Sequence, residues 1–192
     1  MTADHTLETH YQTLIPRYPE LTGKVAVVTG GAKGIGRGIA LRLAREGMRV
    51  VIGDIDGDTL ATTAAALERL GASILAVEGD LGRPAAIRHL FESTEITFGG
   101  VDLLVNNAAD LERRRLLDDH EALLDRQLAV NLRGPYLCSI HAARFMRKAG
   151  GGNIIHISSV GGLRAHQPAF PYDVTKGTID AMTRAMAIDL AE

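Results

Sequence analysis

A tyrosine and a lysine near the end of the sequence have the spacing that acid–base chemistry requires. Tyr172 and Lys176 are four residues apart in PYDVTKG, so on a helix both side chains project from the same face. A neighbouring ammonium stabilises a phenolate, which would allow Tyr172 to take a proton from an alcohol or return it to a ketone. The same spacing is common in solvated helical pairs, so the interpretation depends on the rest of the sequence.

Two serines upstream of the tyrosine could contribute to such a site. Ser158 and Ser159 end the apolar run IIHISS, and Ser159 lies 13 residues before Tyr172. A hydroxyl at the end of a strand can hydrogen-bond a substrate carbonyl. Because side chains alternate along a strand, we expect Ser159 to face the substrate and Ser158 to satisfy local backbone groups.

Asn131 interrupts the apolar run LAVNLRGPYL and needs an explanation of its own. A buried amide requires hydrogen-bond partners, and the nearby Gly134 and Pro135 favour a kink in the helix that this amide could cap. The functional alternative is that Asn131 holds a water molecule in a proton relay. Both interpretations are open from the sequence.

A glycine-rich segment follows the first predicted strand. In TGGAKGIG, residues 29–36, the glycines Gly30, Gly34 and Gly36 allow a tight turn and a close approach of the backbone to a pyrophosphate at the start of a helix. Lys33 and Ile35 belong to the same loop. Because Lys33 is followed by glycine and not by Ser or Thr, the loop is not a P-loop, and a nucleoside triphosphatase is disfavoured.

The second predicted strand ends in Asp54, 18 residues beyond Gly36. A carboxylate at this point can accept hydrogen bonds from the adenosine ribose hydroxyls and would repel a 2′-phosphate. Lys33 could attract that phosphate, but a carboxylate at the strand end should outweigh one flexible, hydrated ammonium. We therefore favour NAD over NADP; the alternative for Asp54 is a simple turn residue in DIDGD.

Strand-like and helix-like segments alternate along the chain. Apolar β-branched runs occur at 24–30, 49–54, 73–80, 101–107 and 152–159, and segments with helical periodicity separate them. This alternation predicts an α/β fold with a doubly wound parallel sheet, in which ligands bind beyond the carboxyl ends of the strands. We expect residues 1–20 to form an extended or partly disordered arm, and residues 21–192 to form one domain.

The composition excludes several other classes of protein. A net charge of -2 argues against a nucleic-acid partner, and no apolar stretch approaches the roughly 20 residues that span a bilayer. The single cysteine, Cys138, lies in an apolar context that predicts a buried free thiol, which suits a cytoplasmic protein. The histidines are scattered without supporting ligands, so we expect no metal site.

Taken together, these residues resemble the short-chain dehydrogenase/reductase family. The segments TGGAKGIG, NNAA and YDVTK, with Asp54, Asp80, Asn131 and Ser159, follow the family's order and spacing over about residues 21–192. The resemblance implies a Rossmann-type sheet and a nicotinamide cofactor. It also implies a catalytic tetrad, which would consist of Asn131, Ser159, Tyr172 and Lys176.

The resemblance also implies roles at the cofactor. Asp80 corresponds to the acid that contacts the adenine, and Lys176 would also bind the nicotinamide ribose. Asn106 corresponds to a residue that steadies the central strand, although Asp80 and Asn106 could instead be caps. The remaining residues that we expect to contact the cofactor lie at the ends of the third and fourth strands: Leu81, Asn107 and Ala108.

The function that follows from the resemblance is an NAD(H)-dependent oxidoreductase. It would transfer a hydride between the cofactor and a small secondary alcohol or ketone, with Tyr172 as the general acid and base. The alternative is a dinucleotide-binding sensor or regulatory module without catalysis. We expect a homodimer or homotetramer that pairs through the helices at 121–148 and 169–192.

Three features depart from the family pattern. Ala109 replaces a frequent glycine, the pair GT follows Lys176 in place of a small pair, and the chain stops at Glu192. The family normally continues through two further strands and a lid over the substrate, so we expect this chain to be part of a longer protein. The substrate cannot be identified from the sequence, although Arg164 and His166 could meet a polar or acidic one.

Overall fold

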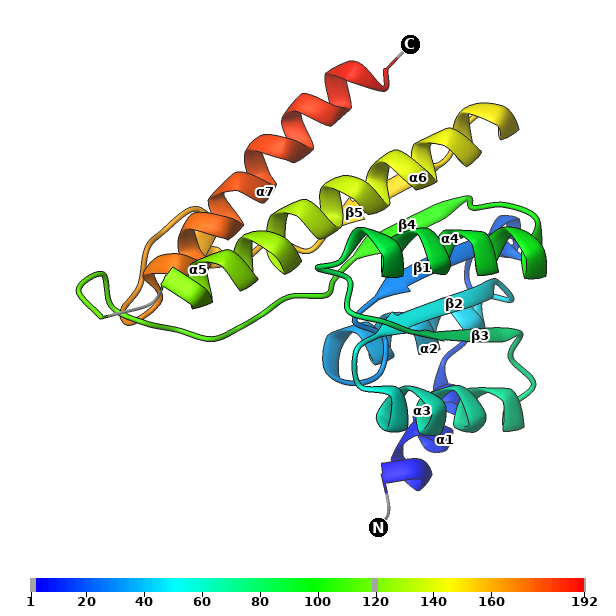
Figure 1. The fold of residues 1–192 in the computed structure, drawn as a ribbon. Coiled ribbons are helices and arrows are strands. Elements are labelled where there is room, and N and C mark those ends of the chain that lie inside the picture. The colour runs from blue at the N-terminus through cyan, green and yellow to red at the C-terminus, as the bar shows by residue number, and fades with distance from the viewer. Residues whose placement is uncertain (1–2, 119–120, 192) are drawn as a thin grey trace.

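The computed structural model describes residues 3–118 and 121–191 and contains a parallel sheet of five strands (Figure 1). Neighbouring strands follow the order β3-β2-β1-β4-β5, and every pairing is parallel. The predicted doubly wound α/β fold is confirmed. The strands are β1 (Val25–Thr29), β2 (Arg49–Asp54), β3 (Ile74–Glu78), β4 (Leu103–Asn106) and β5 (Asn153–His156).

Helices cover both faces of this sheet. The two helices α2 (Gly34–Arg45) and α3 (Gly57–Arg69) lie on one side, and α4 (Pro84–Phe98) and α6 (Gly134–Ala149) lie on the other (Figure 1). The last helix is α7 (Phe170–Asp189).

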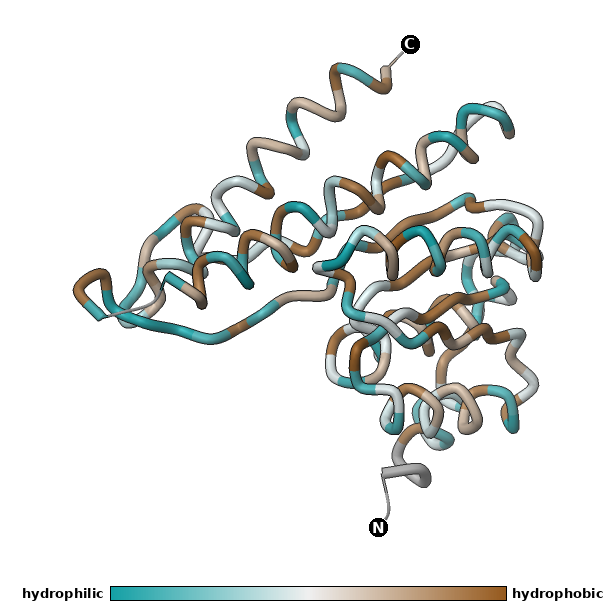
Figure 2. The backbone as a smooth tube through the Cα atoms, viewed as in Figure 1, coloured by the Kyte–Doolittle hydropathy of each residue, from teal (hydrophilic) through white to brown (hydrophobic). Residues whose placement is uncertain are grey.

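The alternation of side chains along β1 explains the two layers. Ala26 and Val28 belong to the apolar cluster under α2 and α3, whereas Val25 and Val27 belong to the cluster under α4 and α6. All four residues are buried, and apolar residues are concentrated along the central strands (Figure 2). A strand that is buried on both faces needs a continuous apolar sequence, which is what KVAVVT provides.

The N-terminal segment differs from the expected extended arm. Residues Ala3–Thr13 form the helix α1, and Pro19–Leu21 form a short 3₁₀ turn. Leu7 is buried in the core cluster, against which Tyr11 and Leu14 also pack. The apolar residues at 7, 11 and 14 have helical spacing, and their burial stabilises the helix. Pro16 and Pro19, which follow it, favoured the prediction of an extended arm.

The helix predicted at 121–148 is interrupted in its middle. It begins as α5 (Glu121–Gln127), widens into a π-helical segment at Leu128–Arg133 and continues as α6. The amide of Gly134 donates to the carbonyl of Ala129, five residues back, and Pro135 has no amide hydrogen to donate. The kink that the sequence favoured near Gly134 and Pro135 therefore takes the form of a π turn.

Cys138 is a free, buried cysteine, as predicted. Burial raises the pKa of its thiol to about 12. None of the helices in the described part of the chain combines the length and apolar character needed to cross a membrane.

Candidate active site

A cavity of about 1050 Å³ extends across the carboxyl ends of the strands. It begins at the glycine loop and Asp54, passes Asp80 and reaches Tyr172 and Lys176. All twelve residues that the sequence assigned to cofactor binding line this one cavity: Gly30, Lys33, Gly34, Ile35, Gly36, Asp54, Asp80, Leu81, Asn107, Ala108, Tyr172 and Lys176. The doubly wound topology brings them together, because the carboxyl ends of parallel strands share one edge of the sheet.

The glycine loop can exist only with glycines at two of its positions. Gly30 has φ +67°, and a Cβ atom there would lie 2.9 Å from the Cα of Ala108. A Cβ atom on Gly36 would collide with the carbonyl oxygen of Gly30. Gly36 thus packs directly against the backbone of Gly30. The helix α2 begins at the cavity, and no side chain caps its first amides. Uncapped amides at a helix start can bind the phosphates of a dinucleotide.

The fourth strand supports this loop from the side. The hydroxyl oxygen of Thr29 accepts the amides of Asn107 at 2.9 Å and Ala108 at 3.1 Å. The side-chain amide of Asn107 donates to the carbonyls of Thr29 at 2.9 Å and Gly30 at 3.1 Å. These hydrogen bonds join β1 to the segment after β4 beside the cavity.

Asp54 both ends β2 and holds the loop. One carboxylate oxygen accepts the amide of Ala32 at 3.0 Å, and the other accepts the amide of Asp56 at 3.1 Å. Each oxygen keeps a lone pair for a ribose hydroxyl. Asp54 therefore acts as a turn residue, as the alternative interpretation held, and also lines the cavity with a negative charge.

Lys33 already has a carboxylate partner in this structure. Its ammonium lies 3.0 Å from Asp56, and this contact raises the pKa of Lys33 and lowers the pKa of Asp56. Its side chain is 69% exposed. The positive charge that could favour a 2′-phosphate is thus partly offset by a neighbouring acid.

Asp80 follows β3 and lines the cavity. One of its carboxylate oxygens accepts the amide of Gly82 at 2.9 Å, and the other contacts the guanidinium of Arg83 at 3.1 Å. Asp80 thus makes the local capping contacts that the sequence left open as an alternative, while it also lines the cavity beside Leu81. Asn106 is buried, and its side-chain amide lies 3.2 Å from both Ser139 and His156, which joins β4 to α6 and β5.

Tyr172 and Lys176 lie on the first turns of α7, at the opposite end of the cavity from the glycine loop. Both are buried, and the ammonium of Lys176 is 5.8 Å from the centre of the Tyr172 ring. The ammonium donates a 2.6 Å hydrogen bond to the carbonyl of Ile157. Burial lowers the pKa of Lys176, and the charge of Asp180 acts in the opposite direction.

The two serines occupy different positions from those that alternation suggested. Ser158 lines the cavity, whereas the hydroxyl of Ser159 accepts the amide of Gly161 at 3.1 Å and caps a 3₁₀ turn at Val160–Gly162. β5 ends at His156, so both serines lie beyond the strand, where alternation no longer determines direction. Ser159 follows Ser158 in the sequence but is not one of the residues that line the cavity.

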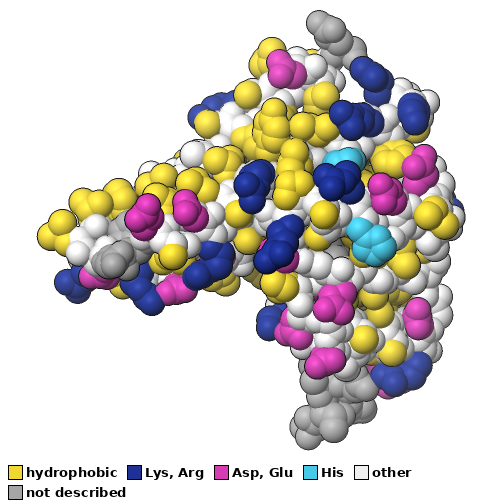
Figure 3. All heavy atoms as spheres, in the orientation of Figure 1, with side chains coloured by type: hydrophobic (Ala, Val, Ile, Leu, Met, Phe, Trp, Pro, Cys, Tyr) yellow, Lys and Arg dark blue, Asp and Glu magenta, His cyan; other side chains and the backbone are white. Residues whose placement is uncertain are grey.

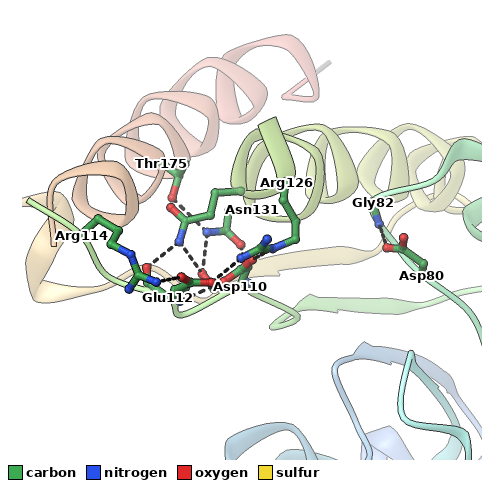
Figure 4. A network of polar contacts seen from close by, with 9 residues as sticks. Asp80, Gly82, Asp110, Glu112, Arg114, Arg126, Asn131 and Thr175 are labelled. Atoms are coloured by element: carbon green, nitrogen blue, oxygen red, sulfur yellow. Dashed lines mark hydrogen bonds and ion pairs between the residues drawn. The ribbon is translucent and has the colours of Figure 1, made fainter. Parts of the chain in front are cut away.

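Asn131 is buried in the π-helical segment and anchors the chain after β4 (Figure 4). Its side-chain oxygen accepts the amide of Asp110 at 2.7 Å. Its side-chain amide donates to the carbonyl of Asp110 at 3.0 Å and to the hydroxyl of Thr175 at 3.1 Å. Asn131 thereby joins the loop at 107–118 to the helix that carries Tyr172.

The loop at 107–118 also contains residues that the sequence analysis missed. Arg126 pairs with both Asp110 and Glu112, and Arg114 pairs with Glu112 (Figure 4). The guanidinium of Arg113 lies 5.7 Å from the centre of the Tyr172 ring. The signal that could have indicated them is the run of three arginines at 113–115, a few residues after the NNAA segment.

His166 and Arg164 are placed differently from each other. The amide of His166 donates to Asp173 at 2.9 Å, and its imidazole lies 3.1 Å from the same carboxylate. Arg164 is exposed. Within residues 3–118 and 121–191, no group of three or more His, Cys, Asp or Glu side chains could hold a metal ion.

Comparisons with known proteins agree with this geometry. Residues 24–192 match the model of the short chain dehydrogenase family. The chain is 38% identical over 171 residues to an uncharacterised oxidoreductase of Thermotoga maritima and 38% identical over 176 residues to D-xylose 1-dehydrogenase of Caulobacter vibrioides. These alignments cover 89% and 90% of this chain, and 67% and 68% of the relatives.

A solved structure has the same fold. The crystal structure of L-sorbose reductase from Gluconobacter frateurii, complexed with NADPH and L-sorbose, superposes with a TM-score of 0.86 at 30% identity. The superposition covers 88% of this chain and 65% of that one, so the chain spans about two thirds of the length of these relatives. The chain belongs to the short-chain dehydrogenase family.

Proposed function

We propose that this protein is an NAD(H)-dependent oxidoreductase for a small secondary alcohol or its ketone. The observation that carries the proposal is the single cavity, which has the glycine loop at one end and the Tyr172–Lys176 pair at the other. A dinucleotide needs an extended binding site. Proton exchange needs buried acid–base groups at one end of that site. Both requirements are met within one space.

The residues at the first end fit a dinucleotide. The space that a Cβ atom of Gly36 would fill belongs to the backbone of Gly30, so the loop is compact and its amides can approach a pyrophosphate. Asp54 would accept the hydroxyls of the adenosine ribose, and Asp80 with Leu81 would lie beside the adenine. When bound, the nicotinamide would supply or accept the hydride.

The residues at the second end would handle the proton. Tyr172 would exchange the proton of the substrate hydroxyl, and the ammonium of Lys176 would stabilise the phenolate. The bond from Lys176 to Ile157 holds that ammonium beside the ring. Ser159 would hold the substrate oxygen after a small rotation toward the cavity, and Asn131 would keep α7 in register with the loop after β4.

We propose NAD as the preferred cofactor. Asp54 presents a carboxylate where a 2′-phosphate would lie, and Lys33 is paired with Asp56. L-sorbose reductase was solved with NADPH, so the proposal of NAD rests on Asp54 and Lys33 and not on the shared fold. A homodimer or homotetramer stays a prediction, which sedimentation can test.

The test is a panel of secondary alcohols and ketones, including sugars and polyols, with NADH and NADPH absorbance as the readout. The preparation should have a C-terminus verified by mass spectrometry. We expect turnover of at least one compound class, with a higher kcat/KM for NADH than for NADPH. Tight NADH binding without turnover of any compound would contradict the proposal and would favour a dinucleotide-binding module without catalysis.

A further inference from the structure

Arg113, on the loop at 107–118, contacts the ring of Tyr172 from outside the residues that line the cavity. Its guanidinium carbon lies 5.7 Å from the centre of the Tyr172 ring, and the side chain is exposed. Tyr172 itself lines the cavity. A contact between an exposed guanidinium and a ring is weaker than a paired, hydrogen-bonded carboxylate contact, so Arg113 can still bind a carboxylate.

Three other charged side chains of this loop, Asp110, Glu112 and Arg114, form ion pairs. Glu112 contacts both Arg114 and Arg126, and Asp110 contacts Arg126 (Figure 4). Within the described residues, Arg113 takes part in no ion pair. Among residues 3–118 and 121–191, no carboxylate therefore pairs with its five donors.

The backbone on both sides of Arg113 is fixed. The carbonyl of Glu112 accepts a 2.7 Å hydrogen bond from the side chain of Gln127, which is fully buried. The carbonyl of Arg114 accepts a 3.1 Å hydrogen bond from the amide of Phe170, at the start of α7. The side chain of Gln127 and the start of α7 thus hold the backbone on either side of Arg113 and restrict the position of its side chain.

Other cations near the reacting centre are occupied. Lys176 donates to the carbonyl of Ile157, and Arg126 is shared between two acids. Basic and acidic side chains both occur along the projecting part of the molecule that contains this loop (Figure 3), so it is not a general basic surface. Among the described residues, Arg113 is therefore a guanidinium beside Tyr172 that has no ion-pair partner.

We infer that Arg113 binds a carboxylate of the substrate next to Tyr172. The inference rests on the proposed function and makes the substrate a hydroxy acid or keto acid, with the charged group a few bonds from the reacting carbon. The planar guanidinium matches a carboxylate through two parallel hydrogen bonds. The carboxylate is bound and positioned, and it is unchanged by the reaction.

The experiment compares matched acids and uncharged analogues. The substrates are 3-hydroxybutyrate with 3-hydroxybutyramide, and D-gluconate with D-glucitol, and the variants are Arg113→Gln and Arg113→Lys. Arg115→Gln is the control, because Arg115 is an exposed arginine of the same loop. For at least one pair we expect wild-type kcat/KM to be about tenfold to a hundredfold higher for the acid, chiefly through KM.

Arg113→Gln should abolish this preference, because it should lower kcat/KM much more for the acid than for the uncharged analogue. Arg113→Lys should restore part of it, because an ammonium keeps the charge but not the planar fork. Arg115→Gln should behave as the wild type. Equal kcat/KM for acid and analogue in the wild type, or an equal loss for both in Arg113→Gln, would overturn the inference.

A binding measurement separates this inference from the proposed function. Calorimetry of the same acids and analogues against the protein–NADH complex does not require turnover. Acid binding that Arg113→Gln weakens about tenfold or more would support the carboxylate site even if no compound is turned over, in which case only the proposed function fails. Absence of any preference for an acid in both assays would overturn the carboxylate site.

Discussion

The ammonium of Lys176 donates a 2.6 Å hydrogen bond to the carbonyl oxygen of Ile157, which joins α7 to the chain just beyond β5. The bond fixes the helix that carries Tyr172 against the edge of the sheet. It also holds the ammonium in a buried position, and burial lowers the pKa of Lys176. One contact thus sets both the position and the charge environment of the proposed acid–base group.

Asp54→Asn should change the cofactor preference. The variant removes the negative charge that faces a 2′-phosphate but retains an oxygen that can accept one of the two backbone amides. We expect the ratio of NADH to NADPH affinity to fall about tenfold. Fluorescence titration of both cofactors measures the ratio, and Asp58→Asn, an exposed acid of the first turn of α3, should leave it unchanged.

Gly36→Ala should weaken NADH binding and Gly38→Ala should not, although both variants replace a glycine of α2. The added methyl of the first variant collides with the backbone of Gly30, so we expect NADH affinity to fall about tenfold or more. The added methyl of the second meets nothing within 4 Å. There we expect unchanged affinity and a free energy of unfolding raised by about 0.5–1 kcal/mol. Similar NADH affinities for the two variants would contradict the glycine-loop assignment.

Asn131→Ala should destabilise the protein. The variant leaves the partly buried backbone groups of Asp110 without their side-chain partner. We expect the free energy of unfolding, measured in urea, to fall by about 1–3 kcal/mol. Asn153→Ala removes an exposed side chain from β5 and should change it by less than about 0.5 kcal/mol. An unchanged stability of Asn131→Ala would leave only the water-relay interpretation of this residue.

His156 should make stability depend on pH. Burial lowers the pKa of His156, and the charge of Lys176 lowers it further. The unfolded chain therefore binds a proton near pH 6.5 while the folded protein does not, so stability falls as pH decreases from 6.5 toward the lowered value. We expect the urea midpoint to fall between pH 7.5 and pH 5.5, and to fall less in His156→Gln. Equal decreases in both proteins would contradict the burial of a neutral imidazole.

Much of the fold could be predicted because it depends on local patterns. Five apolar runs, each followed by helical periodicity, define the parallel sheet, and the sheet places the strand ends at one edge. The residues that we propose to bind the cofactor follow from this order, since they lie where a strand ends or a helix begins. The resemblance to a known family added roles to positions that periodicity had already placed.

The features that could not be predicted depend on contacts between distant segments. The contact of Arg113 with Tyr172 joins the loop at 107–118 to α7, and the side chain of Gln127, at the end of α5, reaches the carbonyl of Glu112 in the same loop. No local period encodes such contacts. The helix α1 was missed for a related reason, since its stability comes from burying Leu7 in the core and not from its own sequence.

The central claim is that Tyr172 exchanges the substrate proton within a site that also binds NADH. The most direct test measures turnover and NADH affinity in Tyr172→Phe, which retains the ring and removes only the hydroxyl. We predict that kcat falls by about a hundredfold to ten-thousandfold while NADH affinity stays at the wild-type value. Turnover within a few fold of the wild type would contradict the claim.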